Sequence, residues 1–105
     1  MAEVLTIEEL RGRIDGIDDQ LVRLLNVRVA CAVEAGRLKQ EAGLPIYQPD
    51  REAHVLASVR KSATELSGPL TADAVVRIFE RIIDEARRAE RQASGRGDGA
   101  SRDGE

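Results

Sequence analysis

The sequence predicts an all-α protein with three helices per chain: one very long N-terminal helix and two shorter ones. Two observations lead to this prediction. The segment Thr6-Ile7-Glu8-Glu9 has the form of a helix start, and no proline follows it until Pro45. Beyond Pro45, short segments containing Gly and Pro separate two further stretches whose apolar residues recur at helical spacing.

The first predicted helix covers residues 7 to about 42. Its apolar residues alternate in steps of three and four, which is typical of a coiled-coil seam: Ile7, Leu10, Ile14, Ile17, Leu21, Leu24, Cys31, Ala35, Leu38 and Ala42. Such a helix is roughly 54 Å long, whereas a compact domain of this size has a radius of gyration of about 13 Å. We therefore expect it not to fold back into a monomeric globule, and we predict an intertwined helical homodimer.

The second predicted helix covers residues 49–66, because Pro49 suits a first helical turn and Ser67-Gly68-Pro69 ends the pattern. Thr71 is placed to cap the third helix, which is predicted over residues 72 to about 91. The last turns of this helix carry three arginines that would complement the helix dipole: Arg87, Arg88 and Arg91.

The C-terminal residues 94–105 contain no apolar side chain larger than alanine, so we expect a disordered tail. Residues 1–93 then form a single domain, near the size at which many domains need extra support. A partner subunit would supply that support.

The composition excludes several classes of protein. A net charge of -3 with one Tyr, one Phe and no Trp disfavours nucleic-acid binding. The single cysteine, Cys31, excludes an internal disulfide, and no Cys/His cluster of the metal-binding type occurs. Because neither a signal peptide nor an 18-residue apolar run is recognisable, we expect a cytoplasmic protein that binds no membrane.

Arg28 stands where the seam of the first helix predicts an apolar residue. A buried guanidinium is costly unless an anion meets it, so we expect beside it either an anionic ligand or a carboxylate across the dimer. Lys39 lies on the same helix face, about 20° around the helix and roughly 16 Å along it. On its own, Lys39 is equally well explained as a solvated charge near a helix end.

Two carboxylates continue the apolar faces of the other helices. Glu52 lies one turn before the apolar stripe of the second helix, and Glu90 lies four residues beyond Ala86 on the third. Each has a structural alternative, Glu52 as a dipole complement and Glu90 as a solvated charge near a helix end. Together with the two cations of the first helix, they predict a polar pocket inside a helical bundle.

Arg11 lies beside the seam, seventeen residues before Arg28 and therefore about 25 Å from it along the helix. The two cannot share a small site within one chain. If two long helices run antiparallel in a dimer, Arg11 of one chain approaches Arg28 of the other, and the two cations suit a dicarboxylate. A surface arginine remains the alternative.

The order and spacing of several motifs resemble the all-helical chorismate mutases between about Ile7 and Glu90. These motifs are Leu-Arg with Ile-Asp, Arg28, Gly-Arg-Leu-Lys39, Asp50-Arg51-Glu52 and Ile-Phe-x-x-Ile-Ile. The resemblance implies an enzyme that rearranges chorismate to prephenate in aromatic amino acid biosynthesis. This Claisen rearrangement uses no nucleophile, metal or cofactor.

By this resemblance, Arg28 of one chain and Arg11 of the other would bind the two substrate carboxylates. Lys39 would donate to the ether oxygen of the breaking bond. Arg51 would line the pocket beside Ala35 and Ile83. Each dimer would then hold two equivalent sites.

The resemblance also implies that Glu52 and the backbone N–H of Gln48 hold the substrate hydroxyl. Glu90 occupies the position of a second ether-oxygen partner, where many relatives have glutamine, so a useful Glu90 must carry a proton and activity should rise at mildly acidic pH. Alternatively, an ionised Glu90 pairs with Lys39 and only positions it. Ala86 stands where a serine often assists a carboxylate, and Gln48 replaces a frequent aspartate.

The same fold and nearly the same cations would also serve an isochorismate-pyruvate lyase or an amino-deoxychorismate mutase. A third alternative is a regulatory helical dimer that acts only when docked to another shikimate-pathway enzyme.

Overall fold

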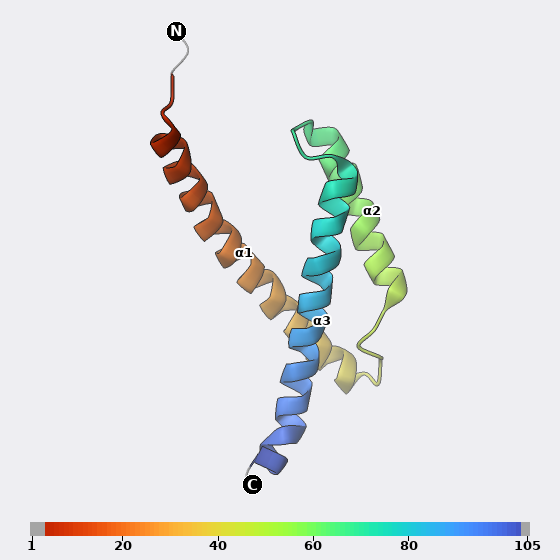
Figure 1. Ribbon diagram of the computed structural model, residues 1–105. Helices are drawn as coiled ribbons and strands as arrows, with labels where there is room; N and C mark the ends of the chain where they lie inside the picture. Colours follow the sequence, from red (N-terminus) through yellow and green to blue (C-terminus); the bar gives the residue numbers. More distant parts are fainter. Residues whose placement is uncertain (1–3, 104–105) are drawn as a thin grey trace.

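The computed structural model describes residues 4–103, with side chains described for residues 4–95. It consists of α1 (Ile7–Glu41), α2 (Pro49–Leu66) and α3 (Ala72–Asp103), and no strand occurs among these residues (Figure 1). The predicted all-α fold with a very long N-terminal helix is confirmed.

The capping box at the start of α1 forms as predicted. The Glu9 backbone N–H donates to Thr6 Oγ1 at 3.1 Å, and the Thr6 backbone N–H donates to a Glu9 carboxylate oxygen at 3.4 Å. At the other end, Gly43 has a φ of +74°, a left-handed conformation that glycine adopts without strain. The chain then turns sharply, and the Leu44 backbone N–H donates to the Lys39 carbonyl at 2.7 Å.

The starts of α2 and α3 also follow the sequence signals. Pro49 occupies the first turn of α2, and Gln48 precedes it without a side-chain capping bond. Thr71 caps α3, because its Oγ1 accepts a hydrogen bond from the Ala74 backbone N–H at 3.0 Å. The turn between the two helices passes through Ser67, which adopts a left-handed conformation with a φ of 55°.

The third helix continues to Asp103, beyond the predicted end near Arg91. Just past that predicted end, the Gln40 side chain hydrogen-bonds the Ser94 hydroxyl, which ties α3 to the last turn of α1. The disorder expected for residues 94–105 stays a prediction, and residues 104 and 105 lie outside the described residues.

The helices form an open arrangement in which α3 packs against both α1 and α2. The first half of α1 projects away from the other two helices (Figure 1). The chain measures 63 × 33 × 17 Å, with a radius of gyration of 18.4 Å. This exceeds the value of about 13 Å for a compact domain of this length.

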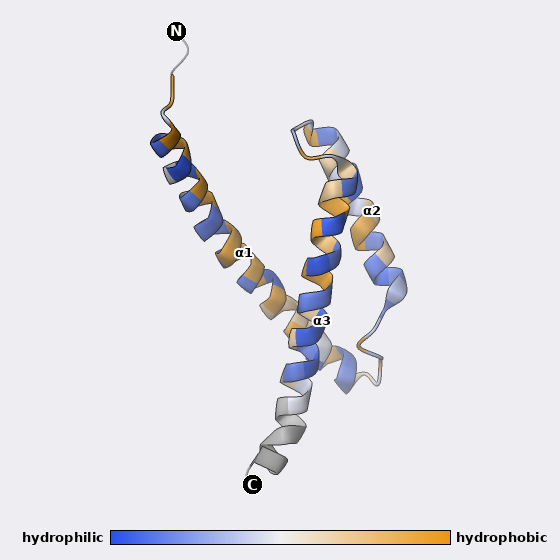
Figure 2. Cartoon of the chain, in the orientation of Figure 1, coloured by the Kyte–Doolittle hydropathy of each residue, from blue (hydrophilic) through white to orange (hydrophobic). Residues whose placement is uncertain are grey.

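Within the described residues, Ala86 is the one buried apolar side chain, at 4% exposure. The predicted seam of α1 stays largely uncovered: Ile14 and Ile17, for example, are each 53% exposed. Figure 2 shows orange, hydrophobic segments along the projecting part of α1. A single chain therefore buries little of the apolar surface that its sequence provides.

In the part of the chain that the structure describes, no helix is both long enough and apolar enough to cross a membrane.

Candidate active site

A pocket of about 340 Å³ lies between the second half of α1, the start of α2 and the middle of α3. Its volume falls in the range of small-molecule sites. The lining includes every predicted site residue except Arg11: Arg28, Ala35, Lys39, Gln48, Arg51, Glu52, Ile83, Ala86 and Glu90. It also includes Arg87, for which the sequence had suggested a different role.

Arg28 reaches the pocket from α1 and is half-buried. Its guanidinium carbon lies 5.9 Å from the centre of the Phe79 ring on α3, an arrangement that suits a cation–π contact. Among the described residues, no carboxylate pairs with Arg28. No carboxylate of the described residues therefore neutralises the cation that interrupts the apolar seam.

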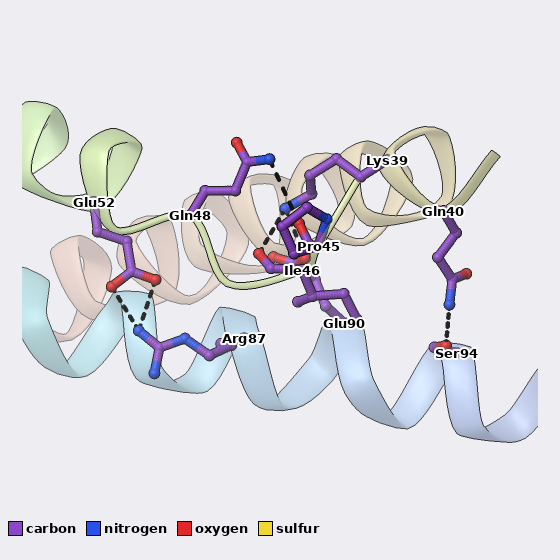
Figure 3. A network of polar contacts seen from close by, with 9 residues as sticks. All are labelled: Lys39, Gln40, Pro45, Ile46, Gln48, Glu52, Arg87, Glu90 and Ser94. Carbon is purple, nitrogen blue, oxygen red and sulfur yellow. Dashed lines mark hydrogen bonds and ion pairs between the residues drawn. The ribbon is translucent and has the colours of Figure 1, made fainter. Parts of the chain in front are cut away.

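Lys39 and Glu90 form an ion pair between α1 and α3. The Lys39 Nζ lies 3.2 Å from Glu90 Oε2 and donates a second hydrogen bond to the Ile46 carbonyl at 3.1 Å (Figure 3). Both side chains are mostly shielded from solvent, at 21% and 11% exposure. Through these two contacts, Lys39 links α3 to the loop that follows α1, and its ammonium group lies in the pocket lining.

Gly36 is the one buried residue of α1 and faces Glu90. A Cβ at this position would lie 2.9 Å from Glu90 Oε2 and 3.3 Å from Glu90 Cγ. Any larger residue would push the Glu90 side chain away from its present position. The glycine therefore gives the carboxylate room beside Lys39.

Glu52 on α2 is held by Arg87 on α3. The Arg87 Nη2 lies 2.6 Å from one Glu52 carboxylate oxygen and 2.7 Å from the other (Figure 3). The hydrogen bond to Glu52 raises the pKa of Arg87, and burial opposes that shift only in part. Arg87 also lies over the Tyr47 ring, at 5.1 Å from its centre.

The interpretation of Arg87 as a dipole complement in the last turns of α3 was wrong. The helix does not end near Arg91, and the guanidinium points to another helix. A signal was available in the spacing, because Arg87 lies four residues after Ile83 and three before Glu90, on the pocket-facing side of the helix. Its partner is 35 residues away in the sequence, so local patterns do not identify it.

Three further predicted residues line the pocket in different ways. Arg51 is exposed and, like Arg28, has no carboxylate partner within the described residues. Gln48 is half-buried, and its side-chain amide donates weakly to the Pro45 carbonyl at 3.5 Å. Ala86 forms the buried floor of the α3 face.

Arg11 lies on the projecting part of α1, is exposed and does not line the pocket. Its distance from Arg28 along the helix, about 25 Å, excludes a shared site within one chain.

The charges of the pocket favour an anion. Its lining holds four cations (Arg28, Lys39, Arg51 and Arg87) and two carboxylates (Glu52 and Glu90), so four minus two leaves two positive charges in excess. Because Lys39 and Arg87 are paired with the carboxylates, the excess resides on Arg28 and Arg51. No group of three or more potential metal ligands occurs among the described residues.

Residues 10–91 match the family model described as chorismate mutase type II. The chain belongs to this family. It is 40% identical over 83 residues to a T-protein of Enterobacter agglomerans, which covers 79% of this chain and 22% of that protein. It is 27% identical over 86 residues to a chorismate mutase of Methanocaldococcus jannaschii, covering 82% of this chain and 85% of that protein.

The fold is also similar to a solved structure of this family. The structure of a chorismate mutase (form II) from Thermus thermophilus matches with a TM-score of 0.75 and 33% identity, covering 81% of this chain and 93% of the other. A bifunctional chorismate mutase/prephenate dehydratase of Aquifex aeolicus is 37% identical over 78 residues, or 73% of this chain. The chain spans about a fifth of the length of this protein and of the T-protein, 22% in each case.

Proposed function

We propose that this chain is a chorismate mutase that rearranges chorismate to prephenate without a cofactor. The observation that carries the proposal is the pocket with two positive charges in excess, built from residues of three helices in a member of this family. Chorismate is a dianion with an ether oxygen and a single hydroxyl. The excess cations suit its carboxylates, and Lys39 and Glu52 are polar groups available to the two neutral oxygens.

The reaction is intramolecular, so the protein needs only to fix the reactive conformer and stabilise charge. As the C–O bond breaks, negative charge grows on the ether oxygen, and the Lys39 ammonium is the donor that would meet it. Arg28, with Arg51 beside it in the pocket lining, would hold a substrate carboxylate so that the side chain stays over the ring. Glu52 and the backbone N–H of Gln48 would receive and donate the hydrogen bonds of the hydroxyl.

The site would be completed by a second copy of the chain. The apolar seam of α1 is exposed over its projecting half, and Arg11 lies on that half. Pairing two such helices antiparallel would bury both seams and would bring Arg11 of one chain towards Arg28 of the other. We therefore propose an intertwined homodimer with two equivalent sites, in which Arg11 binds a substrate carboxylate across the interface.

Glu90 has two alternative roles, positioning Lys39 or donating a proton to the ether oxygen in a hydrogen bond. Its ion pair with Lys39 supports the positioning role, since an ionised carboxylate beside the ammonium group directs that group into the pocket. During the reaction, an ionised Glu90 would oppose the charge that develops on the ether oxygen. A protonated Glu90 would instead donate to it, so we propose that the active form carries this proton.

We place the protein in the cytoplasm, where the substrate is made. The mutase of Aquifex aeolicus is named together with a prephenate dehydratase, which supports a shikimate-pathway enzyme as a partner that consumes the product.

The test is to mix the purified protein with chorismate and to follow the loss of diene absorbance together with prephenate formation. Arg28→Ala should abolish turnover, because it removes an unpaired pocket cation. The control Arg81→Met, in a pair 70% exposed on the arginine side, should leave the rate unchanged. If the wild-type protein does not convert chorismate, the proposal is contradicted. Cleavage of isochorismate would then favour a lyase, and activity only with a partner enzyme would favour a regulatory dimer.

A further inference from the structure

Arg87 is one of the pocket cations, and the proposed reaction mechanism assigns it no role. Unlike Arg28 and Arg51, it is already committed to a carboxylate, and unlike Lys39 it comes from α3 and faces α2. Its surroundings hold it from several sides: Glu52 at 2.6 Å, the Tyr47 ring at 5.1 Å and Asp84 at 3.7 Å.

The contact with Glu52 leaves one hydrogen-bond donor of Arg87 without a partner among the described residues. Its Nη2 serves both Glu52 oxygens, while its Nε is a buried polar atom without a hydrogen-bond partner among the described residues. In many arginine–carboxylate pairs, two parallel N–H groups of the guanidinium meet the two carboxylate oxygens. The observed placement instead brings one amino group onto the carboxylate and keeps that carboxylate at the pocket wall.

We propose that Arg87 is a positioning residue that neutralises Glu52 and thereby makes the pocket select a substrate with a neutral hydroxyl over one with an ammonium group. The inference rests on the proposed mutase function and concerns the substrate class of that same site.

Glu52 can still accept hydrogen bonds from a ligand. An ionised carboxylate has about four acceptor positions, and Arg87 occupies one on each oxygen, so positions remain for a donor in the pocket. A hydroxyl needs only an acceptor. An ammonium group is bound strongly by an unpaired carboxylate, but here it would also meet the positive charge of Arg87 at short range.

Amino-deoxychorismate provides the matching probe, because it carries an amine, protonated at neutral pH, where chorismate has its hydroxyl. The two compounds present the same carboxylates and the same ether oxygen. A difference in their rates therefore reports on the group that faces Glu52.

The experiment measures kcat/KM for both compounds with the wild-type dimer, Arg87→Met, Arg87→Lys and the control Arg81→Met. Arg81 pairs with Glu85 at the same 2.6 Å but within one exposed helix turn. We expect Arg87→Met to lower the chorismate-to-amine ratio of kcat/KM by about tenfold or more. Arg87→Lys, which keeps the charge, should restore most of the ratio, and Arg81→Met should leave it within about twofold.

The ratio does not depend on the fraction of folded enzyme, because both rates scale with it. A second measurement tests whether Arg87 acts through Glu52. In the Glu52→Gln background, adding Arg87→Met should change the chorismate rate by less than about twofold. Full, independent losses from the two substitutions would mean that Arg87 binds the substrate directly and would overturn the inference.

The possible failures are distinguishable. If the wild-type protein does not convert chorismate, the proposed function fails, and the inference fails with it. If the wild-type protein converts chorismate but Arg87→Met keeps the wild-type substrate ratio, the inference alone is overturned.

Discussion

The two halves of α1 differ in what a single chain provides for them. The second half packs against α3, buries Gly36 and directs Arg28 and Lys39 into a pocket. The first half carries a regular apolar seam, yet no described residue of the chain covers that seam. One continuous helix therefore contains a half that packs against α3 and a half whose apolar side chains stay exposed, and we propose that a second copy of the chain covers the exposed half.

The largest effect is expected from a charge in the uncovered seam. If the proposed dimer forms, Ile17→Glu should abolish it together with the helical signal at micromolar concentration and mutase activity, because an unpaired carboxylate would be buried at the interface. The control Arg23→Glu introduces the same side chain on the outer side of the helix and should retain all three. Sedimentation velocity and circular dichroism measure the outcome; a fully active Ile17→Glu monomer would contradict the interpretation of this half.

A smaller effect is expected from a substitution in the second half of α1. Gly36→Ala would place a methyl group against the Glu90 carboxylate, at 2.9 Å in the present geometry, and so should lower kcat by about tenfold while the dimer persists. The matched change Gly12→Ala, in the projecting half, meets no atom within 4 Å. It should leave kcat unchanged and stabilise the helix by up to about 1 kcal/mol. Equal kinetic effects of the two substitutions would remove the distinction between the halves.

The effect of pH at Glu90 should be smaller still. If the proton on Glu90 assists the ether oxygen, the wild-type rate should rise as the pH is lowered from about 7.5 to about 5, and Glu90→Gln should flatten this profile. A wild-type rate that stays flat or falls on acidification, with a slower Glu90→Gln variant, would favour the positioning role.

Much of this organisation is predictable from the sequence, and the reasons are local. Thr6, Pro49 and Thr71 act through hydrogen bonds and backbone angles within one turn, so the helix starts follow from short motifs. Arg28, Glu52 and Glu90 are recognisable because each interrupts or extends an apolar stripe. Helical periodicity alone suffices to place such residues on a common face.

The unpredicted features depend on contacts between helices. The pairing of Arg87 with Glu52 joins residues far apart in the sequence, and an expected helix end near Arg91 offered a sufficient local explanation for the arginine. Gly36 also has a simple local interpretation, because glycine in a helix interior weakens the helix. Its role becomes visible only when Glu90 of α3 lies against it.

In the proposed dimer, each site draws Arg28 and Lys39 from one chain and Arg11 from the other. Subunit complementation tests it directly: inactive Arg11→Ala and Arg28→Ala proteins are unfolded together, refolded as a mixture and assayed with chorismate. A random mixture contains one intact site in each heterodimer, so activity should recover to about a quarter of the wild-type value. Mixing Arg28→Ala with Lys39→Ala is the control, since both residues come from the same chain and no intact site can form. Recovery in the first mixture alone is the predicted result; no recovery in either mixture would contradict a site shared between two chains.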